Sequence, residues 1–186
     1  MLLSRFSILT TTIVFLAIFP RFRGDPDFIL RYHKFEASSS FSKALEFLQG
    51  QIGYNFKSVG LLRRAMTHSS YSEENNRALS IFGASIIETS TSLYYLKNDI
   101  DISPEELNTR ITDVSKVETS CAKDGTRLGL HKVVRVSHKS TTNSSTPSVV
   151  CGAFRAIFGA IAIDAGNCDD AGKVFLVVHG GKALAF

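Results

Sequence analysis

One apolar stretch near the end of the chain limits the fold more than any other feature. It runs from Val149 to Ile163 and carries a single charged residue, Arg155. A segment of this length that is apolar on all sides is typical of a helix buried inside a protein, because a surface helix carries polar residues on its outer face. The sequence therefore predicts a buried central helix here, covered by other elements.

The covering elements are also predicted to be helices. Phe41–Ile52 and Ser58–Met66 each place apolar residues at helical spacing, and Asn76–Lys97 is long and mostly apolar. Two Ser-x-x-Glu capping boxes, at Ser103 and Ser115, predict the starts of two further helices, and the first box is followed by Pro at the first helical position.

A last helix is predicted to begin at Asn167 as its cap and to run towards Val178. Gly180 and Gly181 are expected to end it in a left-handed conformation. No segment shows the alternation of a half-buried strand. The predicted fold class is all-α.

Composition indicates one globular domain. The chain has 186 residues, 44% hydrophobic and 20% charged, and its 21 basic and 17 acidic residues give a net charge of +4. This charge is too small to mark a dedicated nucleic-acid binder, but it permits an anionic partner. The three cysteines, Cys121, Cys151 and Cys168, form no Cys-x-x-Cys pair, so we expect buried thiols and neither a disulfide framework nor a zinc site.

The first 36 residues are predicted to be a hydrophobic targeting leader and linker. A 14-residue apolar run from Phe6 to Phe19 follows one basic residue, as in a secretory signal peptide, while the Ser, Thr and Arg content also suits a mitochondrial presequence. We favour the secretory pathway, with the mitochondrion as the alternative, and a leader that stays attached would engage a membrane. The folded domain is expected over residues 37–180, before a tail of residues 181–186.

Four sequence strings carry a family resemblance. They are IGYNF from Ile52, AMTHSS from Ala65, NNRALSIFGASII from Asn75 and PSVVCGAFRAIFGAIAID from Pro147. In this order and at these separations they resemble the endonuclease domain of ribonuclease III over Phe41–His179. The resemblance implies a helical fold and, in active members of the family, hydrolysis of double-stranded RNA with Mg²⁺.

The four family positions that hold carboxylates carry other residues in this chain. The first motif has Ser80 and Ala84 where the family has Glu and Asp, and the second has Gly152 and Arg155 where the family has Asp and Glu. Mg²⁺ requires anionic oxygen ligands, whereas a guanidinium is positively charged and accepts no hydrogen bond. The resemblance therefore implies a pseudoenzyme with a degenerate site, without a metal or other cofactor.

Two other acids could stand in for the missing carboxylates. Glu88 continues the helix stripe of the first motif, and Asp113 lies in the neighbouring predicted helix. A metal-dependent endonuclease with relocated acids remains a minor alternative. We expect instead that Glu88 forms an ion pair with Arg155 or Arg110, and the alternative is that it faces solvent.

A basic stretch is the candidate RNA-contacting surface. Residues 123–139 include five basic residues and one acid, and the second motif adds one more cation. Such a patch binds phosphates weakly and in a salt-dependent way, and the alternative is a solvated surface loop. The candidate contacts are Lys123, Arg127, Lys132, Arg135, Lys139 and Arg155.

Large apolar residues of the first motif are the candidate dimer face. In the resembling family this helix packs against its two-fold mate, so we expect a homodimer, or a heterodimer with an active relative. The alternative is that these residues fill the core of the monomer. The candidates are Ile81, Phe82, Ile86 and Ile87.

Together these features predict a non-catalytic ribonuclease III-like domain that acts by binding, as an RNA-contacting or assembly module. The alternative is a protein–protein interaction scaffold that binds no RNA. Within the family, the chain is most similar to a short non-catalytic plant type with a hydrophobic leader. That resemblance implies a part in reproductive nuclear fusion, or karyogamy.

Overall fold

The computed structural model describes residues 40–139 and 141–180. The fold below is that of the unit that begins at Phe41. The predicted leader and the predicted tail lie outside the described residues.

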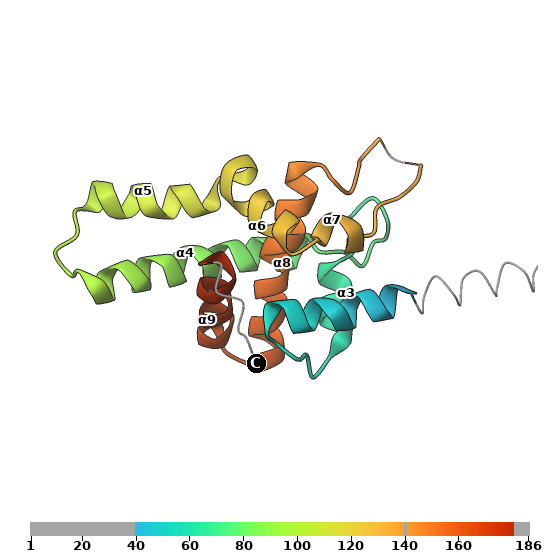
Figure 1. The fold of residues 1–186 in the computed structure, drawn as a ribbon, viewed down its shortest axis with the longest axis horizontal. Helices are drawn as coiled ribbons and strands as arrows, with labels where there is room; N and C mark the ends of the chain where they lie inside the picture. The colour runs from blue at the N-terminus through green and yellow to red at the C-terminus, as the bar shows by residue number, and fades with distance from the viewer. Residues whose placement is uncertain (1–39, 140, 181–186) are drawn as a thin grey trace, which may run out of the picture. The chain divides into compact units, whose positions relative to one another are not determined.

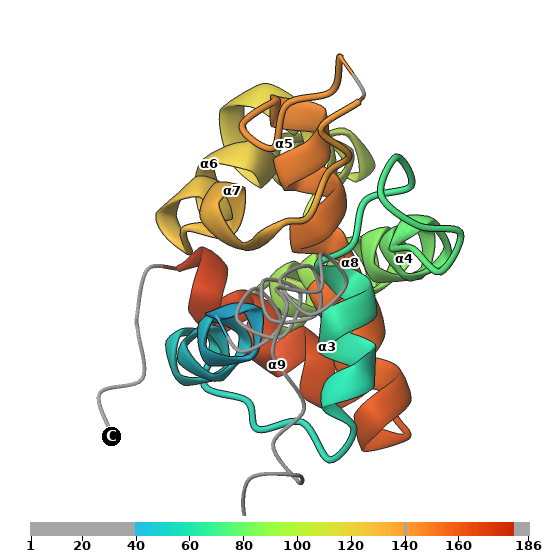
Figure 2. The same ribbon diagram turned by 90° about the vertical axis from the view of Figure 1, so that its right-hand side faces the viewer.

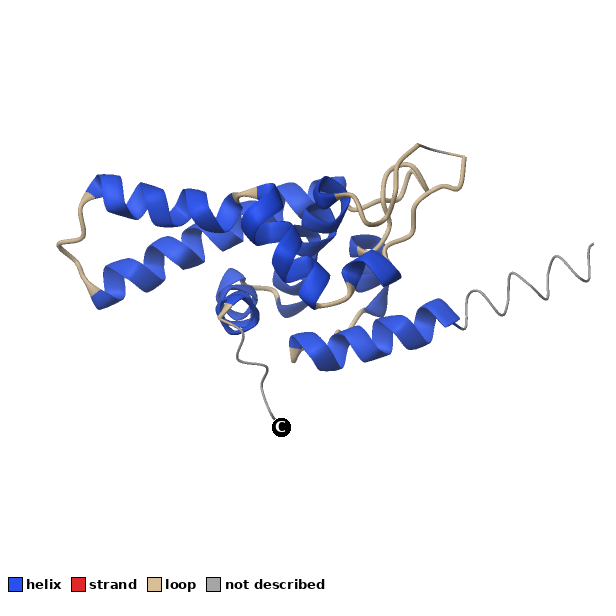
Figure 3. Cartoon of the chain, turned by 45° about the horizontal axis from the view of Figure 1, so that its top comes forward, coloured by secondary structure: helices blue, strands red, loops and turns tan. Residues whose placement is uncertain are grey.

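Helices build the domain, and the described residues contain no strand (Figure 3). One isolated parallel bridge joins Thr67 to Arg135. The predicted all-α class is confirmed. The elements are a first helix over residues 40–52, α3 (Val59–Ala65), α4 (Arg77–Asn98), α5 (Pro104–Ser115), the π-helical turn η1 (Val117–Cys121), α6 (Ala122–Arg127), α7 (Leu130–Val133), α8 (Pro147–Ala165) and α9 (Cys168–His179).

Two predicted helix caps are confirmed. The Ser103 hydroxyl accepts a hydrogen bond from the backbone nitrogen of Glu106 at 3.1 Å, and Pro104 opens α5. The Asn167 side chain accepts from the backbone nitrogen of Asp170 at 3.0 Å and caps α9. Each cap satisfies a backbone donor that the first turn of a helix leaves without a partner.

Two other predicted helix ends are wrong. Ser115 is the last residue of α5 and caps no helix, because its hydroxyl bonds elsewhere. Gly180 follows α9 with a right-handed φ of −68°, and Gly181 lies outside the described residues. The left-handed stop occurs at Gly166 after α8, with φ 79°. There the positive φ favours glycine.

The buried central helix that the sequence predicts is α8. It contacts α3, α4, α6, α7, α9 and η1 and passes through the middle of the domain (Figures 1 and 2). Its Phe154 and Phe158 meet Phe175 of α9 edge to face. In the described part of the chain, α8 alone is long and apolar enough to cross a membrane, but 67% of that span is buried within the domain. It is therefore a core helix.

The long helix α4 crosses α8 so closely that only glycine fits at the contact. A Cβ at Gly83 would overlap the carbonyl oxygen of Arg155, and a Cβ at Gly159 would overlap the carbonyl oxygen of Leu79. Each helix thus presents bare backbone to the other. This contact fixes which side chains of α4 and α8 become neighbours.

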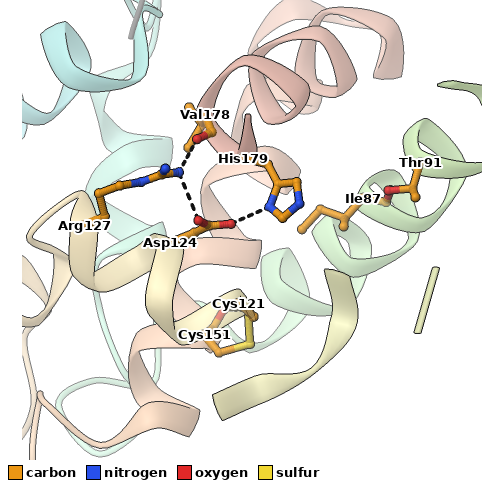
Figure 4. Close-up of polar contacts among 8 residues, drawn as sticks. All are labelled: Ile87, Thr91, Cys121, Asp124, Arg127, Cys151, Val178 and His179. Carbon is orange, nitrogen blue, oxygen red and sulfur yellow. Dashed lines mark hydrogen bonds and ion pairs between the residues drawn. A yellow bond between two sulfur atoms is a disulfide. The ribbon is translucent and has the colours of Figure 1, made fainter. Parts of the chain in front are cut away.

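The cysteines differ from the prediction of free buried thiols. Cys121 of η1 and Cys151 of α8 form a disulfide with their Cα atoms 5.0 Å apart (Figure 4). Cys168, at the start of α9, is a free and exposed thiol. The prediction fails because the bonded residues are 30 positions apart and match no cysteine motif. They meet only once η1 has folded onto α8.

The helix crossing makes the protein sensitive to a single methyl group. Replacement of Gly83 by Ala is expected to lower the free energy of unfolding by about 3 kcal/mol, because the added Cβ forces two backbones apart. Urea denaturation followed by circular dichroism measures this change.

Gly50→Ala is the matched control, since a Cβ at Gly50 meets nothing within 4 Å. This variant gains helix propensity, and its free energy of unfolding rises by up to about 1 kcal/mol. A Gly83→Ala variant as stable as the wild type would contradict the close crossing of α4 and α8.

The disulfide is expected to show in a thiol count and in stability. With denaturant but no reductant, one thiol reacts with a thiol reagent, and three react once the denatured protein is also reduced. The cross-link closes a loop of 30 residues. Reduction should therefore lower the free energy of unfolding by about 3–4 kcal/mol. Three reactive thiols before reduction would show that the bond is absent.

Candidate functional site

The four substituted carboxylate positions come together where α4 crosses α8. A Cβ at Gly152 would lie 4.0 Å from the Ser80 hydroxyl oxygen, so the two motifs face each other here. Ala84 lies one turn along α4 from Ser80, and Arg155 lies nearly one turn along α8 from Gly152. The two motifs therefore meet in the fold.

Arg155 is held in place by the end of α5. Its Nη2 donates to the carbonyl oxygen of Ser115 at 2.7 Å. The Ser115 hydroxyl in turn donates to a carboxylate oxygen of Glu88 at 3.3 Å. Ser115 thus joins the guanidinium and the carboxylate, and this role explains why it caps no helix.

The expected ion pair of Glu88 with Arg155 or Arg110 is wrong. Arg155 reaches Glu88 only through Ser115. Arg110 pairs with Glu106 of its own helix at 2.9 Å and lies over the ring of Tyr95. The sequence pattern missed Ser115 because its apparent capping box offered a local use for the same hydroxyl.

The donor atoms at this site do not fit a pair of magnesium ions. The four positions supply a hydroxyl, a methyl group, a hydrogen atom and a guanidinium, none of which is an anionic oxygen. Nearby, Asp113 pairs with Lys116 at 2.8 Å. Across the described residues, no three His, Cys, Asp or Glu side chains gather closely enough to hold a metal ion.

Arg135, a candidate RNA contact, is built into the domain. It donates to the Thr67 hydroxyl at 2.6 Å, and its guanidinium carbon lies 4.2 Å from the ring centre of Phe41 and 4.7 Å from that of Tyr71. Its backbone also pairs with Met66 and His68. These contacts join the first helix to the segment after α3, a structural use of the cation.

Arg127 is also engaged within the domain. It pairs with Asp124 at 2.9 Å and donates to the carbonyl oxygen of Val178 (Figure 4). Asp124 is buried and lies 2.6 Å from Nδ1 of His179, whose ring stacks on Phe175. This cluster ties α6 to the end of α9. A buried carboxylate needs such partners, because burial without them is costly.

Three of the four exposed candidate RNA contacts form no ion pair within the described residues. They are Lys123, Lys132 and Lys139. No ion pair among the described residues includes the ammonium group of any of these three lysines. The basic surface is therefore smaller than the sequence suggests, because Arg127, Arg135 and Arg155 are used inside the domain.

The candidate dimer face divides between surface and core. Ile81 is 74% exposed and Phe82 is 39% exposed, whereas Ile86 and Ile87 are each 3% exposed and belong to the core. The same helix periodicity that makes α4 amphipathic separates these neighbours. A partner can therefore reach Ile81 and Phe82 but not the two buried isoleucines.

An apolar groove, which the sequence did not predict, continues this surface along α4. It lies between α4 and α9 and has a volume of about 520 Å³. Its apolar lining includes Phe82, Leu93, Tyr94 and Leu176. A sequence cannot show this groove, because it depends on where α9 lies against α4.

The retained family strings hold the fold together. Asp164 accepts hydrogen bonds from the backbone nitrogens of Lys57 and Ser58, each at 2.8 Å, and from the Tyr54 hydroxyl at 3.0 Å. Burial raises the pKa of Asp164, but these hydrogen bonds outweigh it and keep the pKa below its ordinary value. Burial and the bond to Asp164 raise the pKa of Tyr54 to about 12.

His68 likewise has a structural role. Its Nδ1 accepts from the backbone nitrogen of Ser70 at 3.1 Å and lies 2.9 Å from the Ser70 hydroxyl. Burial, and then the charge of Arg77, lower the pKa of His68. The neutral ring therefore fixes a turn after α3.

Comparison with known proteins identifies the family. Residues 58–177 match the family model described as Ribonuclease-III-like. The matched region contains α3, α4 and α8, and with them all four substituted carboxylate positions. This chain belongs to the ribonuclease-III-like family, and the predicted resemblance is confirmed.

Individual relatives agree with this assignment. The chain is 56% identical over 161 residues to Protein NUCLEAR FUSION DEFECTIVE 2 from Arabidopsis thaliana, covering 87% of this chain and 82% of that protein. It is 32% identical over 142 residues to Ribonuclease 3 from Clostridium acetobutylicum, covering 73% of this chain. It spans only 60% of the length of that bacterial protein.

Solved structures support the fold. The nuclease domain of ribonuclease III from Campylobacter jejuni aligns with a TM-score of 0.68 and 25% identity, over 76% of this chain and 97% of that domain. A second structure of the same domain, with structural flexibility in a region involved in dimer formation, aligns with a TM-score of 0.67. The predicted ribonuclease III nuclease-domain fold is thus confirmed.

Proposed function

We propose that this chain is a non-catalytic ribonuclease III-like domain that acts by assembling with another protein chain. The main support is the set of side chains at the four substituted positions, where α4 crosses α8. It contains a guanidinium and no carboxylate. Relocated acids have little support, because Glu88 bonds to Ser115 and Asp113 pairs with Lys116. Arg155, held by Ser115, opposes a divalent cation at this site.

The exposed part of α4 supports assembly. Ile81 lies on the surface next to Phe82, and the apolar groove continues from Phe82 towards Leu93 and Tyr94. An exposed apolar surface of this kind gains free energy when a partner covers it. The partner we propose is a second copy of this chain, since the related Campylobacter domain has a region involved in dimer formation. An active relative with the same face would give a heterodimer.

Weak RNA contact is the second candidate function. The three exposed lysines, Lys123, Lys132 and Lys139, favour it. About three phosphate contacts give weak and strongly salt-dependent binding. RNA contact therefore ranks below assembly.

The disulfide helps to choose between the two compartments proposed for this chain. Disulfides persist in oxidising compartments and are rare where thiols are kept reduced. The bond between Cys121 and Cys151 therefore supports entry into the secretory pathway, which also suits the apolar run of the leader, over the mitochondrial alternative. This setting further favours a protein scaffold over RNA contact.

The biological setting follows from the Arabidopsis relative. That protein is named for a defect in nuclear fusion. We propose that this chain takes part in karyogamy, as an assembly component rather than as a nuclease.

Assembly through α4 predicts a specific sensitivity to charge. The purified chain is expected to sediment as a dimer, and Ile81→Glu is expected to weaken self-association at least about tenfold, because the dimer would bury the new carboxylate. Because the contact is apolar, higher salt should not weaken it. Sedimentation velocity over a range of protein and salt concentrations measures both effects.

Ile100→Glu is the control for this variant. Ile100 is 76% exposed and lies beyond the C-terminal end of α4, so the same change there should leave the dimer intact. A monomeric chain that binds duplex RNA, with binding weakened by salt and by Lys132→Glu together with Lys139→Glu, would refute assembly and favour the second candidate.

A further inference from the structure

A single sequence signal for N-glycosylation lies on a loop of the domain. Asn143, Ser144 and Ser145 form an Asn-x-Ser triplet whose middle residue is not proline, and no other Asn in the chain begins such a triplet. The triplet lies between the end of α7 and the start of α8. Figures 1 and 2 both show this loop extending away from the helices.

The acceptor residue is accessible. Asn143 is exposed, and so are Ser145 and Thr146 after it. The side-chain oxygen of Asn143 accepts a hydrogen bond from the backbone nitrogen of Ser145 at 2.9 Å. This bond uses the oxygen of the carboxamide and not Nδ2, the atom that glycosylation modifies. The loop therefore presents the reacting group of Asn143 at the surface.

The disulfide supplies a second and independent observation. Oxidation of Cys121 and Cys151 belongs to the same lumenal compartment in which N-glycans are attached. The inference thus rests on the proposed entry into the secretory pathway. The sequence triplet alone would carry little weight in a protein kept in a reducing compartment.

We propose that Asn143 is an N-glycosylation site. Its Nδ2 attacks the anomeric carbon of an oligosaccharide carried on a polyprenyl diphosphate. The new bond joins Nδ2 to that carbon, the bond from the carbon to the diphosphate oxygen breaks, the polyprenyl diphosphate leaves, and the amide loses one proton. The reaction involves no oxidation or reduction. An oligosaccharyltransferase of the cell joins the two substrates.

A glycan at Asn143 would affect the two candidate functions differently. Lys139 lies four residues before Asn143 on the same loop. A bulky, hydrated glycan at Asn143 would hinder the approach of an RNA backbone to this end of the basic surface. Ile81 and Phe82 belong to α4, a different element. The inference therefore agrees with assembly rather than RNA contact as the function.

Translation of the full chain with endoplasmic-reticulum microsomes tests the proposal. The expected product is protected from added protease and shows one mobility shift, which an N-glycan-removing enzyme reverses. Asn143→Gln and Ser145→Ala should each abolish the shift. Ser144→Ala keeps the triplet, and Asn108→Gln changes an exposed Asn outside any triplet, so both controls should retain it.

The outcomes distinguish this inference from the proposal on which it rests. A protected chain without a shift would overturn glycosylation and leave the secretory proposal standing. A chain that stays accessible to protease and unshifted would overturn both. A shift that survives Asn143→Gln would overturn the assignment of the site.

Discussion

The contact of bare backbone between α4 and α8 is the constraint on which the rest of this structure depends. Because Gly83 and Gly159 carry no side chains, the two helices approach until peptide groups touch. The same approach brings Ser80 opposite Gly152 and sets Arg155 beside the end of α5. The positions that the family resemblance assigns to metal-binding carboxylates thus lie together, and in this chain none of them holds a carboxylate.

A structural feature could be predicted here when the residues that form it lie close together in the sequence. The buried α8, the caps at Ser103 and Asn167, and the substituted carboxylate positions all follow from short stretches of sequence. The disulfide, the link from Arg155 through Ser115 to Glu88, and the groove beside α9 join segments far apart in the chain. The sequence also suggests more free cations than the structure has, since it does not show that Arg135 lies over the rings of Phe41 and Tyr71.

The remaining surface features favour a protein that binds proteins. Ile81 and Phe82 of α4 are exposed, whereas three arginines of the basic surface bond within the domain. The disulfide is consistent with the proposed entry into the secretory pathway. Loss of the acids is consistent with this use, since an apolar face is easier to bury when no carboxylate borders it.

The central proposal is that this site does not support hydrolysis through Mg²⁺. Its most direct test is to incubate the purified chain with duplex RNA and Mg²⁺, beside a variant that carries Ser80→Glu, Ala84→Asp, Gly152→Asp and Arg155→Glu and a matched sample with EDTA. We expect no cleavage by the natural sequence above the EDTA sample. Cleavage that needs Mg²⁺, stops with EDTA and is lost on Glu88→Gln would contradict the proposal.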